Sequence, residues 1–223
     1  MTTDVNMIER PPPLFKKSLP SEKRIDKAEA DRAFYIDFEG FVKEAPAMIG
    51  ILVENHFEQI VLDTKFRGAA VYKEPMAVMS GESVISNLLS RSLAENRKIV
   101  AFSTLEKEQC MRWYGIDISQ SYVNAKSVAG KWARKASSKI RYRTLKDFEV
   151  LTGYERSRDT GYRKNTSCLK AALRDLERHG ELHNTAPKKH WTNLRKHNRQ
   201  DVEAMKHILL VTFSSDLSQN HRI

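Results

Sequence analysis

Residues 33–40 read Ala-Phe-Tyr-Ile-Asp-Phe-Glu-Gly, and this stretch decides the fold. Phenylalanine and isoleucine side chains alternate there with Tyr35, Asp37 and Glu39. A period of two predicts a β-strand, with the two acids on the same face. Residues two apart in a strand have Cα atoms about 6.6 Å apart, so these carboxylates are neighbours.

The stretch is followed by further strand and helix patterns. Two β-rich runs at 48–53 and 57–62 flank a short turn and predict a hairpin. Residues 81–97 and 105–114 have helical spacing on either side of a short apolar strand at 98–102. This order predicts an α/β domain whose mixed sheet has three antiparallel strands, then parallel strands, flanked by helices.

The C-terminal half is predicted to be mostly helical. We expect a short helix ended by Gly153, a helix ended by Gly180, a connector at 184–189 containing a proline, and a long helix from about 192 to 213. The resulting boundaries are an N-terminal arm at 1–32, one domain at 33–213 and a tail at 214–223. The arm has a run of three prolines and mixed charges, so we expect it to be loosely packed.

Composition restricts the class of protein. The 223 residues have a formal charge of +10, which favours a polyanionic partner such as nucleic acid. Two cysteines without a C-x-x-C pair exclude a disulfide scaffold and a thiolate zinc finger. There is no apolar run long enough for a membrane span and no secretory signal at the start, so we expect a cytoplasmic protein.

Asp37 and Glu39 are the first candidate site residues. Two like charges on a central strand repel each other and resist desolvation, and a hard divalent cation such as Mg²⁺ compensates both effects. The alternative is a strand with one hydrated face. Residues 147–149 repeat the letters Asp-Phe-Glu in a helical pattern, where we expect both acids in an exposed first turn.

His197 and Asp201 form the second candidate pair. They are spaced i, i+4 on the terminal helix, so they share one edge of its apolar stripe. A carboxylate in that position needs a partner or a metal ion. The alternative is a His–Asp hydrogen bond that only stabilises the helix.

Glu106 is the third candidate, with Glu108 as a nearby alternative. It lies in the first helical turn after a strand, at the sheet edge where open α/β sheets bind ligands. Ser103 and Glu106 also match a helix-capping box, so a structural role remains an alternative.

A basic stretch with interspersed aromatic residues is the candidate nucleic-acid surface. Cations that bind phosphates and rings that stack on bases are the groups expected in a single-strand site. The alternative is a solvated face. The candidate residues are Lys131, Trp132, Arg134, Lys135, Lys139, Arg141 and Arg143.

In combination, these features resemble the DEDD group of exonucleases, which have a ribonuclease H-like fold. The resemblance covers roughly residues 33–213 and is carried by 37–40 (Asp-Phe-Glu-Gly) and 197–202 (His-Asn-Arg-Gln-Asp-Val). The middle segment at 102–106 is shorter than in the family and has Glu where the family usually has Asp. His197 replaces the tyrosine expected at this spacing. The chain is most similar to the predicted bacterial ribonuclease H-like nuclease branch.

The resemblance implies a 3′–5′ exonuclease that hydrolyses DNA or RNA with two Mg²⁺ or Mn²⁺ ions. It implies that Asp37, Glu39 and Asp201 hold one ion, that Asp37 shares a second with Glu106, and that His197 is the general base. Two ions about 3.5–4 Å apart activate water and stabilise the leaving oxygen. A non-catalytic nucleic-acid-binding protein on the same fold and a structure-specific endonuclease are the alternatives.

Overall fold

The computed structural model describes residues 24–136, 144–157 and 165–214. Within them, six strands form a mixed sheet in the order β4-β3-β2-β1-β5-β6. β1, β2 and β3 pair with one another antiparallel. β4 is parallel to β3 at one edge, and β5 and β6 continue the sheet in parallel with β1 at the other. The predicted α/β class is therefore confirmed, in an arrangement consistent with a ribonuclease H-like fold. The strands are β1 (Phe34–Glu39), β2 (Met48–Val53), β3 (His56–Val61), β4 (Ala77–Val78), β5 (Ile99–Ala101) and β6 (Tyr122–Asn124).

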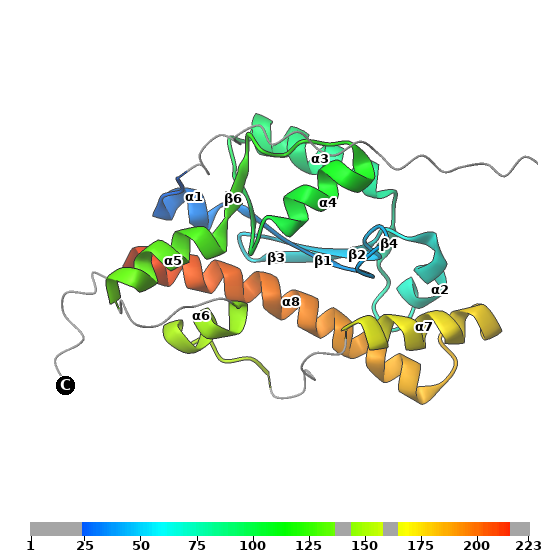
Figure 1. Cartoon of the computed structure of the whole chain (residues 1–223). Helices are drawn as coiled ribbons and strands as arrows, with labels where there is room; N and C mark the ends of the chain where they lie inside the picture. Colours follow the sequence, from blue (N-terminus) through cyan, green and yellow to red (C-terminus); the bar gives the residue numbers. More distant parts are fainter. Residues whose placement is uncertain (1–23, 137–143, 158–164, 215–223) are drawn as a thin grey trace, which may run out of the picture.

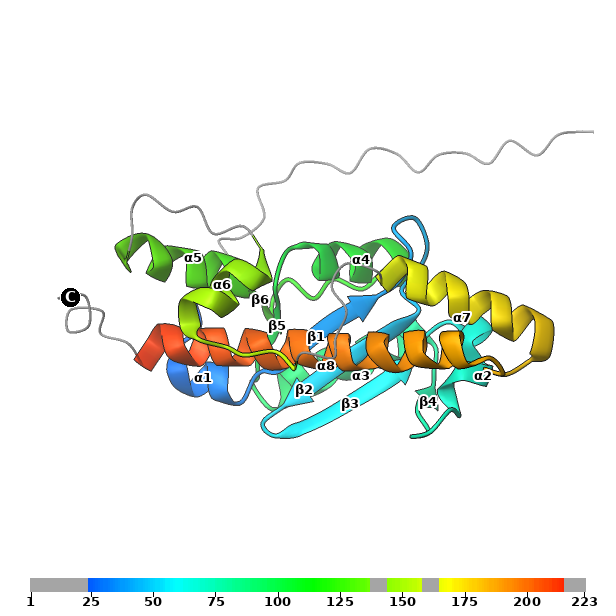
Figure 2. The same ribbon diagram turned by 90° about the horizontal axis from the view of Figure 1, so that it is seen from below.

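Helices cover both faces of the sheet. In Figure 1, α3 (Gly81–Ala94) and α4 (Leu105–Tyr114) lie above it, and α8 (Thr185–Ser214) runs below it. Figure 2 shows α8 crossing the sheet, with α7 beside its first half and α5 and α6 near its second half. The remaining helices are α1 (Lys27–Asp31), η1 (Thr64–Phe66), α2 (Arg67–Ala70), α5 (Ala125–Ala136), α6 (Leu145–Thr152) and α7 (Asn165–His179).

The alternation in β1 separates two apolar layers. Phe34 and Ile36 are fully buried with Ile85 of α3 on one face. Tyr35 is buried on the other face, with Val202 of α8 in the same cluster. Because side chains two apart share a face, Asp37 and Glu39 lie on the side of the sheet that α8 covers. The fold thus directs both acids of β1 toward the terminal helix.

Part of the predicted N-terminal arm is ordered, which corrects the boundary at residue 32. Residues 24–32 include α1, whose first turn is closed by a capping box between Asp26 and Glu29. Ile25 and Ala30 are buried against the core, and Tyr35 donates its hydroxyl hydrogen to the Ala30 carbonyl oxygen at 2.6 Å. Apolar side chains among the charges thus anchor this segment. Residues 1–23 and 215–223 lie outside the described residues.

The predicted connector at 184–189 is wrong, because α8 already begins at Thr185. Pro187 lies in the first turn of the helix. A proline is tolerated there because the first backbone N–H groups of a helix have no intrahelical acceptor. Other boundaries agree: Gly153 and Gly180 end α6 and α7 with positive φ angles of 70° and 73°. β4, β6 and α5 were not predicted.

None of the helices in the described ranges combines the length and apolarity that a membrane span requires.

Candidate functional site

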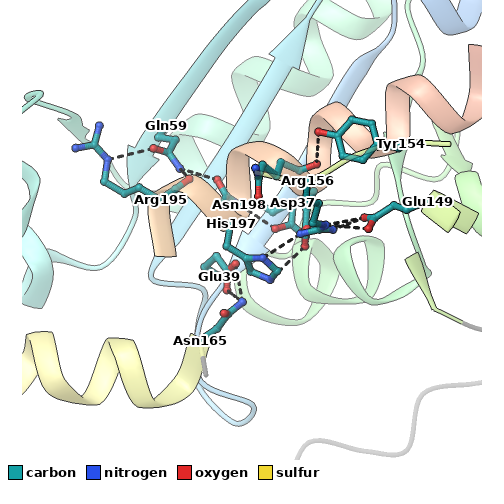
Figure 3. Close-up of polar contacts among 12 residues, drawn as sticks. Asp37, Glu39, Gln59, Glu149, Tyr154, Arg156, Asn165, Arg195, His197 and Asn198 are labelled. Carbon is teal, nitrogen blue, oxygen red and sulfur yellow. Dashed lines mark hydrogen bonds and ion pairs between the residues drawn. The ribbon is translucent and has the colours of Figure 1, made fainter. Parts of the chain in front are cut away.

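The carboxyl end of β1 supplies two of the site's acids (Figure 3). Glu39 is buried, with 5% of its surface exposed, and Asp37 is half-buried. Asn165, the first residue of α7, donates from Nδ2 to both carboxylate oxygens of Glu39, at 2.9 and 3.0 Å. The strand thus provides the acids, and a helix distant in the sequence provides the partner of one of them.

Helix α8 brings Asp201 to the β1 acids. The negative charge of Asp201 contributes to raising the pKa of both Asp37 and Glu39. Because a charge acts on a pKa strongly only at short range, these carboxylates lie close together. The terminal helix and the first strand therefore meet at the acids that the sequence singled out.

Glu106 joins the same group, and Glu108 does not. Glu106 is buried in the first turn of α4, directly after β5, and Ser103 Oγ lies 3.3 Å from its Oε2. The charge of Glu106 also contributes to raising the pKa of Asp37, whereas Glu108 is exposed on the helix surface. Of the two alternatives left open by the sequence, the structure brings Glu106 to the site.

Burial and mutual repulsion raise the pKa values of these carboxyl groups. Burial is the larger cause in each case, and the neighbouring carboxylates add to it. The pKa of Glu39 rises to about 8 and that of Glu106 to about 7, while the pKa of Asp37 is raised well above its usual value. The pKa of Asp201 is also raised by burial, although His197 and Arg156 oppose the rise.

Asn198 connects α8 to three strands. Asp37, Gly50 and Gln59 lie in one row across β1, β2 and β3. The fully buried Asn198 donates from Nδ2 to the Asp37 carboxylate and carbonyl oxygens, each at 2.9 Å, and accepts from Gln59 Nε2 at 2.9 Å. A Cβ atom on Gly50 would lie 2.1 Å from Asn198 Oδ1, so glycine is required for this close approach. The amide orients Asp37.

Arg156 supplies a cation next to Asp201, and Figure 3 shows its guanidinium beside Glu149 and His197. Its Nη2 lies 2.6 Å from Asp201 Oδ1, and its Nε donates to both oxygens of Glu149 at 2.9 Å. Burial alone would lower the pKa of Arg156, but the hydrogen bonds and charges of Glu149 and Asp201 outweigh it and raise the pKa. The guanidinium therefore stays charged inside the acidic site.

Glu149 is buried, so the prediction that both acids of residues 147–149 lie exposed is wrong. Only 3% of the surface of Glu149 is accessible. The sequence could not reveal its partner, because Arg156 follows α6 in a segment without periodicity. Asp147 does lie in the first helical turn, where it completes a capping box with Thr144.

Both ring nitrogens of His197 have partners. Nδ1 lies 3.1 Å from Arg156 Nη1, and Nε2 lies 3.6 Å from Asp201 Oδ2. An arginine can only donate, so Nδ1 is the acceptor and the ring hydrogen is on Nε2, facing Asp201. His197 must therefore exchange a partner before it can accept a proton from water.

The donor set fits hard divalent cations. Carboxylate oxygens are the ligands that Mg²⁺ and Mn²⁺ prefer. A bound cation also stabilises the ionised form of buried carboxyl groups, which burial and mutual repulsion disfavour. Asp37, Glu39, Glu106 and Asp201 are the residues that would hold such ions. Across the described ranges, no three His, Cys, Asp or Glu side chains are gathered closely enough to hold a metal ion. Side chains of the protein contact the four carboxylates instead.

The predicted nucleic-acid residues fall partly on α5. Lys131, Arg134 and Lys135 are exposed on this helix. The Trp132 ring is half-buried and packs against a cluster that contains Phe148 of α6, so only part of it remains accessible for stacking. Lys139, Arg141 and Arg143 lie outside the described residues.

Sequence reasoning missed three polar partners of the acids: Asn165, Arg156 and Asn198. Of these, only Asn198 left a signal, because it interrupts an otherwise apolar helix stripe at Leu194, Val202 and Met205. A buried asparagine on such a stripe needs hydrogen-bond partners. The other two lie in polar stretches, where nothing distinguishes them from neighbouring residues.

A scan against protein-family models finds no match to this chain, and a search of curated proteins finds no relative. The fold and the site define an α/β protein with an acidic centre between β1, α4 and α8.

Proposed function

We propose that this protein is a metal-dependent nuclease that hydrolyses phosphodiester bonds of DNA or RNA from the 3′ end, using two Mg²⁺ or Mn²⁺ ions. One observation carries the proposal. Asp37, Glu39, Glu106 and Asp201 come from one strand and two helices, and their charges couple at the carboxyl edge of the parallel strands. Such a costly grouping is typical of functional sites.

The proposed roles follow from what each side chain contacts. The four carboxylates bind the cations, which when bound supply an electrophilic clamp for the phosphate and an activated water. Asn198 holds the carboxylate of Asp37 in a fixed orientation through its Nδ2 hydrogen bond. His197 takes a proton from water once Nδ1 is released from Arg156, since a neutral imidazole is a suitable base near pH 7.

Two basic helices flank the site and support a nucleic-acid substrate. Figure 2 shows α5 and α7 near opposite ends of α8, while Asp201 lies in the middle of that helix. Lys131, Arg134 and Lys135 are exposed on α5, and α7 presents a second exposed set: Lys170, Arg174 and Arg178. A single-stranded nucleic acid that crosses α8 from α5 to α7 passes the four acids.

The function is tested by incubating the full chain with end-labelled single-stranded DNA and RNA in Mg²⁺, Mn²⁺ or EDTA. We expect stepwise shortening from the 3′ end in either metal and none in EDTA. Cleavage of a closed circle would contradict the exonuclease activity and support the endonuclease alternative. Binding without cleavage in any metal would contradict the nuclease activity as a whole.

A non-catalytic nucleic-acid-binding protein is the second candidate. It is favoured by the ion pair between Arg156 and Asp201, which neutralises one of the four carboxylates without a metal ion. The same assay separates the two candidates, because this one binds the labelled strands equally well in EDTA and in Mg²⁺.

A further inference from the structure

The guanidinium of Arg156 places a positive charge against Asp201, as a bound metal ion would. Its side chain is 9% exposed, and it contacts Asp201 on one side and Glu149 on the other. An arginine keeps its charge at any physiological pH, so its neutralisation of Asp201 does not depend on pH.

The two carboxylate oxygens of Asp201 both face groups of the protein. Oδ1 is 2.6 Å from Arg156 Nη2, and Oδ2 is 3.6 Å from His197 Nε2. A cation that binds Asp201 together with Asp37 needs one of these oxygens. A cation on Oδ1 would lie beside the guanidinium of Arg156, whose positive charge repels it at this short distance.

Glu149 explains how that contact could be lost without unfolding the site. It accepts from Nε of Arg156 at 2.9 Å, so the arginine stays anchored when its Nη2 leaves Asp201. Glu149 is itself buried and needs this cation. Nη2 contacts both Glu149 and Asp201, whereas Nε contacts Glu149 alone and is the anchor that does not depend on Asp201.

We propose that Arg156 occupies Asp201 in place of a divalent cation, and that metal ions bind only by displacing it there. This inference rests on the proposed metal-dependent function. Competition from Arg156 then lowers the affinity of the site for metal ions. In the metal-free protein, the guanidinium of Arg156 stabilises the site.

The test measures Mn²⁺ binding to the EDTA-stripped full chain by calorimetry. The variant is Arg156→Gln combined with Glu149→Gln, which removes the competitor without leaving Glu149 buried and unpaired or changing the net charge. We expect the double variant to bind Mn²⁺ roughly five-fold more tightly or better, because the competing contact is gone. Arg97→Gln is the control, since it also removes an arginine that bridges two acids, Glu54 and Glu95, but near the opposite end of β1.

Each outcome separates the inference from the proposed function. Tighter binding in the double variant, with Arg97→Gln unchanged, supports the competition. Equal affinity in all proteins overturns the inference and leaves the metal-dependent function standing. No Mn²⁺ binding at millimolar concentrations in any protein overturns both.

Arg156→Lys keeps the test valid if the double variant does not fold. A single ammonium group cannot hold Glu149 and Asp201 in the same fork, so we again expect tighter Mn²⁺ binding than in the wild type. Unchanged or weaker binding in this variant also overturns the inference.

Discussion

The triplet Asp-Phe-Glu occurs twice in this chain, and its two copies lie in different environments. At residues 37–39 it forms the end of β1, where the strand period puts both acids on the face toward α8. At residues 147–149 it lies in α6, where successive side chains are about 100° apart. Asp147 then caps its own helix, Phe148 enters the core and Glu149 turns to Arg156.

The difference lies in how each pair of acids is compensated. In α6, a backbone N–H donates to Asp147 at 2.8 Å, and a guanidinium binds Glu149. In β1, the acids accept hydrogen bonds from the neutral amides of Asn198 and Asn165, and further carboxylates lie nearby. The same letters therefore give a structural helix turn in one place and, in the other, a cluster of buried carboxylates for which we propose bound cations.

Replacing the first acid of each triplet is expected to give the largest contrast. Asp37→Ala should reduce Mg²⁺-dependent cleavage by about a thousandfold or more, because a ligand of the ions is lost. Asp147→Ala should leave cleavage unchanged and lower the free energy of unfolding by about 1 kcal/mol, because one capping hydrogen bond is lost. Cleavage rates and urea unfolding measure the two effects. Undiminished cleavage by Asp37→Ala would remove this site from consideration.

The buried glutamates of the site, Glu39 on β1 and Glu106 on α4, also predict a pH dependence in EDTA. Glu39 and Glu106, with pKa values of about 8 and about 7, keep their protons in the folded protein, whereas the unfolded chain releases them near 4.5. The unfolded state then binds fewer protons, so stability falls as pH rises from about 5 to 8. Melting temperatures in EDTA should decrease over this range, and Mg²⁺ should restore them at the upper end.

Glu39→Gln provides the control for the pH dependence. A glutamine still offers Asn165 a carbonyl oxygen but has no proton to release, so the decline with pH should be shallower. A flat or rising curve in the wild type would contradict the raised pKa values.

The position of α8 over β1 can be tested at Gly50. Gly50→Ala introduces a Cβ that would lie 2.1 Å from Asn198 Oδ1, so α8 or the amide must move. We expect a loss of about 1–3 kcal/mol in unfolding free energy, together with weaker cleavage. Gly130→Ala on α5 is the matched control, because its Cβ meets no atom closer than 3.8 Å and the helix should gain about 0.5–1 kcal/mol. Equal stability of the two variants would contradict the close approach.

The smallest expected effect concerns α5, whose apolar face packs on Phe148 of the helical triplet. This packing directs Lys131, Arg134 and Lys135 outward. Replacing all three with glutamine should weaken binding to single strands and reduce the slope of log affinity against log salt by about 0.7 per lost phosphate contact. Titrations at several salt concentrations measure it. An unchanged slope would assign these cations to a solvated face.

Much of the fold was predictable from local patterns. The alternation around Asp37, the helical spacing from 105 to 114 and the stops at Gly153 and Gly180 each depend on a few adjacent residues, and the structure confirms them. Short elements were missed where the pattern is too brief, such as β6 with three residues. The connector predicted at 184–189 is instead the first turn of α8, because the local sequence does not show whether Pro187 lies before or inside a helix.

The sequence by itself determined which acids share a face, because periods of 2 and 3.6 fix the direction of neighbouring side chains. It therefore identified Asp37 with Glu39, and His197 with Asp201, as pairs. Only the tertiary structure decided what lies opposite each pair: Asn198 over Gly50, Glu106 rather than Glu108, and Arg156 against Asp201. Such contacts join residues from separate elements, and their energies depend on burial and distance in space, which no local spacing encodes.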